Sequence, residues 1–160
     1  MARTAHAAVT ELVLEIFRLN GELIAMGDAL VGELGLTSAR WQVIGAIALA
    51  ATPLSIAQIA RNMGLARQSV QRVANELAAE GFVHFAPNPH HRRAKLARLT
   101  PRGESAYAAA TARWTPKASG LAAGVKIRDI DAALAVLRHI RTRMERLDPS
   151  GAKKDIRNDA

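Results

Sequence analysis

A polar helix face and a basic loop hold the residues of this chain that are best suited to binding chemistry. The helix face presents hydrogen-bonding side chains at steps of one, three and four residues, namely Arg67, Gln68, Gln71, Arg72 and Asn75. The loop, residues 86–95, is rich in turn-forming and basic residues. Guanidinium and ammonium groups in such positions can neutralise phosphates, so the expected chemistry is binding to nucleic acid.

Positive charge is concentrated around these two features. Residues 61–103 hold eight Lys or Arg and two acids, a net charge of +6, whereas residues 1–60 carry −2 and residues 104–160 carry +4. A run of charge alone is usually a solvated surface. Here the charges fall on an exposed helix face and in a loop, where phosphate neutralisation and counterion release require them.

Two short helices joined by a tight turn position the polar face. Ser55 and Gln58 form a capping box at the start of the first helix. Gly64 ends that helix, because glycine tolerates the left-handed conformation found at helix ends. The second helix carries its buried stripe at i, i+3, i+4 and i+7, on Val70, Val73, Ala74 and Leu77.

A hairpin follows the second helix and holds the basic loop at its tip. Residues 82–85 and 96–99 read as strands from their aromatic and β-branched content. Residues 54–56 are expected to pair with them as a short third strand. Helix, turn, helix and basic hairpin together outline a winged helix-turn-helix, a module that reads duplex DNA.

Long amphipathic helices are predicted on both sides of this module. Residues 8–33 and 130–147 each carry an apolar stripe at steps of three and four residues. Residues 39–51 are apolar almost all round and should form a central helix. Thr100-Pro101 is a strong start signal for another helix, which Pro116 and Gly120 are expected to kink or end. The chain is therefore predicted to be mainly α, with about six helices and a small β-hairpin wing.

The apolar stripes at both ends predict a homodimer. A single copy would expose them, and symmetric dimers are the commonest soluble oligomers; the alternative is that the flanks cover their own core. The predicted organisation is an N-terminal dimerisation helix in residues 1–36 and a DNA-binding lobe in residues 37–100. C-terminal dimerisation helices follow in residues 101–147, and residues 148–160 are predicted to be a disordered tail.

The sequence argues against catalysis, metal binding and membrane insertion. It holds no cysteine, no glycine-rich phosphate loop, no nucleophile beside an evident base and no carboxylate pair, and no cofactor is expected. His90 and His91 lack nearby Cys, Asp or Glu, which makes a poor metal site. The uncharged run 41–60 is about as long as a membrane span, but Pro53 would break a spanning helix. We expect a cytoplasmic, nucleoid-associated protein that is not an enzyme.

These segments resemble the MarR family of bacterial transcriptional regulators. The stretches that carry the resemblance are residues 65–70 (LARQSV), 80–83 (EGFV) and 88–103 (NPHHRRAKLARLTPRG), of which the last is the most specific. The resemblance extends to about Leu147. It implies a triangular homodimer of winged helix-turn-helix subunits that usually represses transcription from a palindromic operator. In many members a small, often phenolic, molecule binds between the dimer helices and the DNA lobe and releases the DNA.

The resemblance also implies which residues contact DNA. The second helix would place Arg67, Gln68, Ser69, Gln71 and Arg72 toward the major groove, where arginine can bond guanine in two places and glutamine can do so with adenine. In the wing, Arg93 would enter the minor groove, and Arg92 and Lys95 would contact phosphates. Structural alternatives are that Ser69 only faces solvent and that Arg72 pairs with Glu76 at i+4.

Two positions depart from the family pattern. His91, also in the DNA-contacting wing, stands where the family usually has an aspartate that positions the wing arginine, and a charged histidine cannot do so. Ala66 occupies what is often a serine N-cap of the second helix, a loss worth about 1 kcal/mol. That helix must therefore be held mainly by packing.

An effector site is expected on the predicted central helix, where the family places its ligand. Trp41 and Ile44 would contact the molecule, with Arg40 as an anion partner. The alternative, that Trp41 belongs to the core, is equally compatible with the sequence. A different class of function also stays open, in which a basic helical interaction module binds RNA or an acidic protein without ligand control.

Overall fold

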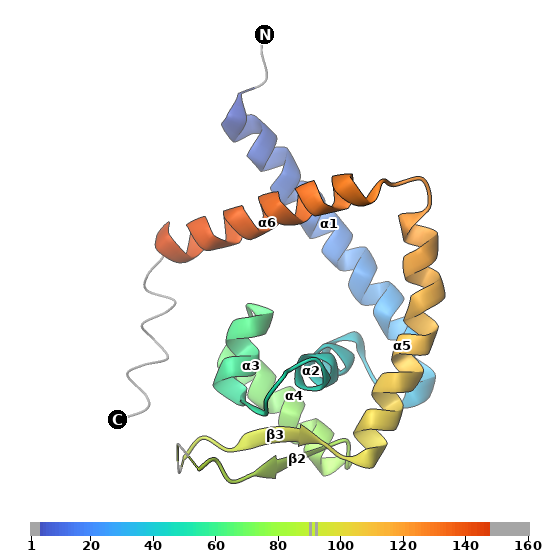
Figure 1. Ribbon diagram of the computed structural model, residues 1–160, viewed down its shortest axis with the longest axis vertical. Helices are drawn as coiled ribbons and strands as arrows, with labels where there is room; N and C mark the ends of the chain where they lie inside the picture. Colours follow the sequence, from blue (N-terminus) through green and yellow to red (C-terminus); the bar gives the residue numbers. More distant parts are fainter. Residues whose placement is uncertain (1–3, 90, 92, 148–160) are drawn as a thin grey trace. The chain divides into compact units, whose positions relative to one another are not determined.

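The computed structural model describes residues 4–89, 91 and 93–147, and over these residues the fold is mainly α-helical (Figure 1). In chain order the elements are α1 (Ala5–Val31), a 3-10 turn η1 (Gly32–Leu34), α2 (Ser38–Ala48), β1 (Leu54–Ser55), α3 (Ile56–Met63), α4 (Arg67–Ala79), β2 (Val83–Ala86), β3 (Leu96–Leu99), α5 (Pro101–Ala122) and α6 (Ile127–Leu147). Six α-helices and a small sheet within the described residues confirm the predicted winged helix-turn-helix class.

The chain divides into two compact units, residues 1–114 and residues 115–160. The division falls inside α5 and beside Pro116. Pro116 and Gly120 are expected to kink or end this helix; it does not end at Pro116 but continues to Ala122, two residues beyond Gly120. A proline inside a helix removes one backbone hydrogen bond and crowds the preceding turn. The assignment of segments to DNA binding and dimerisation stays a prediction.

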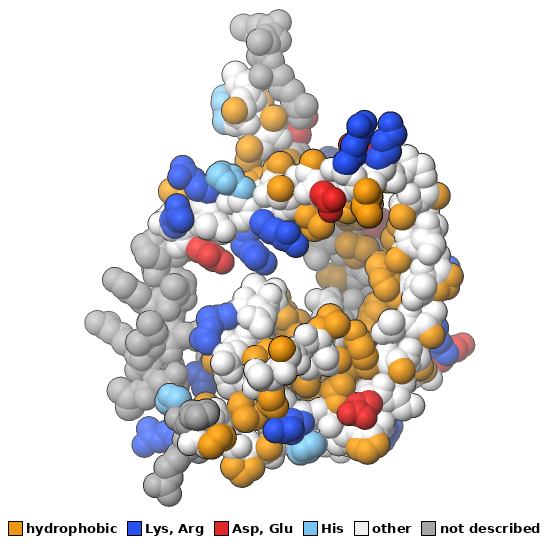
Figure 2. Space-filling model, viewed as in Figure 1, with side chains coloured by type: hydrophobic (Ala, Val, Ile, Leu, Met, Phe, Trp, Pro, Cys, Tyr) orange, Lys and Arg blue, Asp and Glu red, His pale blue; other side chains and the backbone are white. Residues whose placement is uncertain are grey.

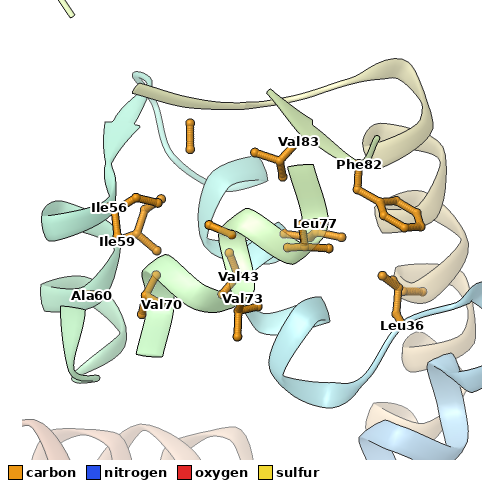
Figure 3. Packing of buried hydrophobic residues seen from close by; sticks show 14 of the residues in the cluster. Leu36, Val43, Ile56, Ile59, Ala60, Val70, Val73, Leu77, Phe82 and Val83 are labelled. Atoms are coloured by element: carbon orange, nitrogen blue, oxygen red, sulfur yellow. The ribbon is translucent and has the colours of Figure 1, made fainter. Parts of the chain in front are cut away.

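The core of the first unit lies between the sheet and helices α2, α3 and α4. All four residues of the predicted α4 stripe, Val70, Val73, Ala74 and Leu77, are buried. They belong to one cluster with Val43 and Ile44 of α2, Ile56 and Ile59 of α3, and Val83 of β2 (Figure 3). The inner face of α4 is thus fixed by packing, as the helical period predicts.

The sheet has three antiparallel strands in the order β1–β3–β2. Leu54 of β1 pairs with Ala97 of β3, and Val83 of β2 pairs with Leu99. The predicted third strand is confirmed but shorter, since Ile56 already belongs to α3. The hairpin lies on one side of α2, α3 and α4 (Figure 1), which places the loop between β2 and β3 at the edge of the helix-turn-helix.

The start of α5 ties the base of the wing to the end of α4. The Thr100 N–H donates to the Phe82 carbonyl oxygen (3.0 Å), and the Thr100 hydroxyl accepts from the Gly103 N–H (3.1 Å), which confirms the predicted helix start. Arg102 donates to the Glu80 carbonyl oxygen (2.8 Å), and its guanidinium carbon lies 4.3 Å from the centre of the Phe82 ring. The Thr-Pro-Arg-Gly segment therefore anchors the C-terminal end of α4.

The helices α1 and α6 both carry exposed apolar side chains. On α1 these are Val9, Leu14, Phe17, Leu19, Leu23 and Ile24, and on α6 they are Ile127, Ile130, Leu134, Val136, Leu137, Met144 and Leu147. Figure 2 shows apolar side chains along α6, with basic ones interspersed among them. On α6 most of these side chains recur at steps of three and four residues, whereas those of α1 lie on several sides of the helix.

Helix α2 begins near its predicted start but is shorter than predicted. The Thr37 hydroxyl accepts from the Arg40 N–H (3.3 Å), and the helix ends at Ala48 rather than at Ala51. Pro53 favours an extended backbone at the residue before it, so the chain must leave the helix before β1 begins. Within the described ranges, no helix is long and apolar enough to cross a membrane.

Candidate nucleic-acid interface

The turn between α3 and α4 is built from local signals in the sequence. The Ser55 hydroxyl accepts from the Gln58 N–H (3.4 Å), and the Gln58 side-chain oxygen accepts from the Ser55 N–H (2.8 Å), which confirms the capping box. Gly64 ends α3 in the left-handed region, with φ of 66°. Ala66 gives α4 no side-chain cap. The placement of α4 therefore depends on its buried face and on contacts near its C-terminal end.

The predicted recognition residues lie together on the first two turns of α4. Gln68, Ser69 and Arg72 are exposed, whereas Arg67 and Gln71 are half-buried. The Gln71 amide donates to the side-chain oxygen of Asn75 (2.9 Å), which orients it along the helix. The N–H donors of arginine and the amide donors and acceptors of glutamine thus lie on one helix face, as in helices that enter a groove of DNA.

The described part of the wing also exposes basic side chains. His91, Arg93 and Lys95 are exposed around a turn in which the His91 N–H donates to the Asn88 carbonyl oxygen (3.2 Å) and the His91 carbonyl oxygen accepts from the Ala94 N–H (3.2 Å). Arg92, predicted to contact phosphate, and His90 lie outside the described residues. Among the residues that are described, no three His, Cys, Asp or Glu side chains are grouped to hold a metal ion.

An ion-pair network joins α2 to the outer side of α4. Arg40 Nη1 donates to Oε2 of Glu80 (3.0 Å), its Nη2 forms an ion pair with Oε1 of Glu80 (2.6 Å), and Nη2 also lies 3.4 Å from Oε2 of Glu76. Arg72 donates to Oε1 of Glu76 (2.7 Å), which is the i to i+4 pair expected as the alternative for this residue. The side chain of Arg40 is 19% exposed, whereas that of Arg72 is 71% exposed.

The two glutamates around Arg40 shift its pKa. Hydrogen bonding to Glu80 raises the pKa of Arg40 above its ordinary value; burial opposes this shift, and the charges of Glu80 and Glu76 add to it. The sequence contains no local signal for this contact, because Arg40 and Glu80 are distant in the chain. The sequence does show that Glu76 and Glu80, at i and i+4, share one face of α4. Two carboxylates so spaced repel each other, and a nearby cation would stabilise them.

The three residues expected to bind an effector occupy different environments. Ile44 is a core residue with 0% exposure. Trp41 is half-buried and packs against the core, and its ring meets that of Trp114 edge to face, with centroids 5.9 Å apart. Arg40 is engaged by Glu76 and Glu80. The Trp41–Trp114 pair is thus the part of this region that is both aromatic and partly accessible.

Comparison with known proteins links this geometry to one family. A profile described as MarR family matches residues 34–94. An uncharacterized protein of Mycobacterium tuberculosis is 38% identical over 105 residues, which cover 66% of this chain and 72% of that protein. BadR of Rhodopseudomonas palustris, named a transcriptional activatory protein, is 25% identical over 151 residues, covering 92% of this chain and 86% of BadR.

A solved structure shares the fold over most of the chain. CouR from Rhodococcus jostii RHA1, crystallised with p-coumaroyl-CoA, matches with a TM-score of 0.73 over 81% of this chain and 90% of CouR. Its sequence is 21% identical, so this likeness is one of fold.

Proposed function

Because this chain belongs to the MarR family of transcription regulators, which bind DNA, we propose that it acts as a homodimer on a palindromic operator. It is a regulator and not an enzyme. The observation that carries the proposal is the two-sided character of α4: Val70, Val73, Ala74 and Leu77 fix its inner face, and polar side chains occupy the outer one. A helix held in this way can enter the major groove without losing its own packing.

In the proposed complex, the first two turns of α4 read base edges. The side chains assigned to the major groove are Arg67, Gln68, Ser69, Gln71 and Arg72. Gln68 is exposed and one turn from Arg72, so the two could contact neighbouring base pairs. Their chemistry favours adenine for glutamine and guanine for arginine.

The wing supplies contacts to the backbone and the minor groove. Arg93 is assigned to the minor groove, Arg92 and Lys95 are assigned to phosphates of the DNA backbone, and His91 belongs to the same DNA-contacting wing. The exposure of His91, Arg93 and Lys95 on one turn supports this assignment. Such contacts position the protein on any duplex, whereas base contacts choose among sequences.

The proposed dimer forms through α1 and α6. Both helices expose apolar side chains, and their charges are complementary: α1 carries Glu11, Glu15, Glu22 and Asp28 against Arg18, whereas residues 138–147 of α6 carry Arg138, Arg141, Arg143 and Arg146 against Glu145. Association of two copies would bury the apolar stripes and pair opposite charges. A two-fold dimer would also match a palindromic operator.

We further propose that an aromatic acid or its thioester controls DNA binding. CouR was crystallised with p-coumaroyl-CoA, and the Trp41–Trp114 pair offers an aromatic surface to such a molecule. The expected outcome is release of DNA and relief of repression. BadR is named an activator, so a reporter assay with the promoter upstream of the chain's own gene must establish the direction; higher expression in the presence of the protein would exclude repression there.

One binding experiment separates this function from its alternative. The purified protein is titrated against the duplex upstream of its own gene, a random duplex of equal length and an RNA of the same sequence, between about 50 and 200 mM salt. We expect the upstream duplex to bind about a thousandfold or more tightly than the random one. Equal affinities for all three nucleic acids would favour a non-specific basic interaction module. Unchanged DNA affinity across a panel of aromatic acids and thioesters would exclude the proposed effector class.

A further inference from the structure

Glu76 is shared by two arginines that come from different helices. Its Oε1 accepts from Arg72 on α4 (2.7 Å), and its Oε2 lies 3.4 Å from Nη2 of Arg40 on α2. Arg40 also contacts Glu80, one turn further along α4, through a hydrogen bond (3.0 Å) and an ion pair (2.6 Å). The result is a chain of ion pairs, Glu80–Arg40–Glu76–Arg72, that runs from the end of α4 to its polar face.

This series of ion pairs offsets the negative charge of Glu76 and Glu80 on the recognition helix. Two carboxylates at i and i+4 repel each other. Glu76 also lies one turn from Arg72, within about one Debye length of any phosphate that Arg72 would contact. Without a cation between them, Glu76 and Glu80 would oppose the approach of DNA, and Glu76 would hold Arg72 more tightly.

Arg40 is well placed to supply that cation without touching DNA itself. It stands in the first turn of α2, its side chain is mostly covered, and its Nη1 also lies 3.4 Å from the Gly35 carbonyl oxygen. A planar guanidinium can hold one carboxylate with two hydrogen bonds and still reach another, which a lysine cannot do. Arg72, by contrast, has a mostly exposed side chain and pairs with Glu76 on its own helix.

We propose that Arg40 is a positioning residue for DNA binding, which retains Glu76 and Glu80 so that Arg72 can leave Glu76 for a phosphate or a base. The inference rests on the proposed function, since it requires α4 to face DNA. When Arg72 turns to the duplex, Glu76 keeps Arg40 as its cation partner. No partly buried carboxylate is then left uncompensated beside the phosphates.

The test compares Arg40→Met with the triple variant R40M/E76Q/E80Q. The single variant leaves two carboxylates without Arg40, and we expect about tenfold weaker binding and a salt slope smaller in magnitude by about one, because Arg72 stays on Glu76. The triple variant lacks all of these ion pairs but also lacks the negative charge. We expect it to recover the affinity of the unchanged protein to within about twofold, together with its salt slope. A triple variant as weak as R40M would overturn the inference and leave Arg40 a merely structural role.

Two further variants keep the test decisive. Arg113→Met removes another partly covered arginine, which donates to the Leu30 carbonyl oxygen and to Glu33 away from α4; it should leave DNA affinity unchanged. Should R40M fail to fold, Glu76→Gln retains the Arg40–Glu80 pair and gives a second reading. Because this change releases Arg72, affinity should equal or exceed that of the unchanged protein, and weaker binding would contradict the inference.

The failure of this inference is distinguishable from failure of the proposed function. If the unchanged protein binds no duplex in the same assay, the proposed function fails. If it binds and R40M binds equally well with an equal salt slope, only the role of Arg40 fails. Thermal unfolding of each variant reports separately on whether a change in affinity reflects loss of folded protein.

Discussion

The carbonyl oxygen of Phe82 occupies the space that a side chain at Gly103 would need. A Cβ built on Gly103 would overlap this oxygen, and it would also lie 3.4 Å from the Cβ of Leu99. The oxygen cannot move away freely, because it accepts the Thr100 N–H at 3.0 Å. The absence of a side chain therefore lets the first turn of α5 close against the end of α4 and the base of the wing.

We expect Gly103→Ala to destabilise the first unit by about 1–3 kcal/mol, the usual cost of overpacking. Urea denaturation should show a lower midpoint with an unchanged slope. Gly45→Ala is the matched control, since a Cβ at Gly45 meets only a Tyr107 ring carbon, at an ordinary 3.7 Å. Within α2 this change should stabilise the protein by about 0.5–1 kcal/mol. Equal effects of the two substitutions would show that the close approach at Gly103 is unimportant.

Arg93→Ala should weaken binding by a similar factor on every duplex, because a contact to the backbone or a narrow groove carries little base information. The magnitude of the salt slope should fall by about one. Titrations on the upstream duplex and on a random duplex at several salt concentrations measure both quantities. Lys117→Ala removes the same charge from an exposed position on α5 and should change neither. A loss confined to one sequence would instead assign Arg93 to base recognition.

Gln68→Ala should change sequence preference more than overall affinity. Its exposed amide can pair with adenine in two places, and loss of that pair relaxes selection at one position by about 1–3 kcal/mol. Selection from a randomised duplex library measures the preference. Gln42→Ala is the control: this glutamine lies on α2, where it donates to the Ser38 hydroxyl (3.3 Å), away from the recognition face. If the Gln68 variant selects the same sites, Gln68 does not read the operator.

Phe17→Glu should convert the proposed dimer to monomers. Phe17 is a large apolar side chain on α1 with 69% exposure, and a glutamate in its place would remove apolar burial and require a charge to be desolvated at the interface. Analytical ultracentrifugation measures the mass in solution. Leu49→Glu, at a residue of 79% exposure beyond the end of α2, introduces the same charge outside α1 and α6 and should leave the dimer intact. A Phe17 variant that stays dimeric would remove this part of α1 from the interface.

The sequence predicts features of the fold that depend on neighbours in the chain. The stripe Val70, Val73, Ala74 and Leu77 is wholly buried because one helical period controls all four residues. The capping box at Ser55 and the start of α5 at Thr100 are also local, and both are confirmed. The short third strand was predictable from its position before α3, although its length was not.

Features that depend on distant contacts could not be predicted. Arg40 was expected to serve as an anion partner, and only the fold brings it to Glu76 and Glu80 on α4. The sequence predicts a kink or an end of α5 at Pro116 and Gly120 but does not say at which residue the helix stops; it passes Pro116 despite one missing hydrogen bond and ends at Ala122. The sequence identifies the polar face of α4, but the network that controls its charge requires the structure.

The edge-to-face contact between Trp41 and Trp114 gives this protein a built-in optical probe. These are the only two tryptophans in the chain, and their rings are 5.9 Å apart and inclined at 65°. Intrinsic emission excited at the red edge of indole absorption therefore originates from one location, where α2 meets α5. Unfolding of that junction, or a molecule that settles against it, should alter the spectrum without any added label.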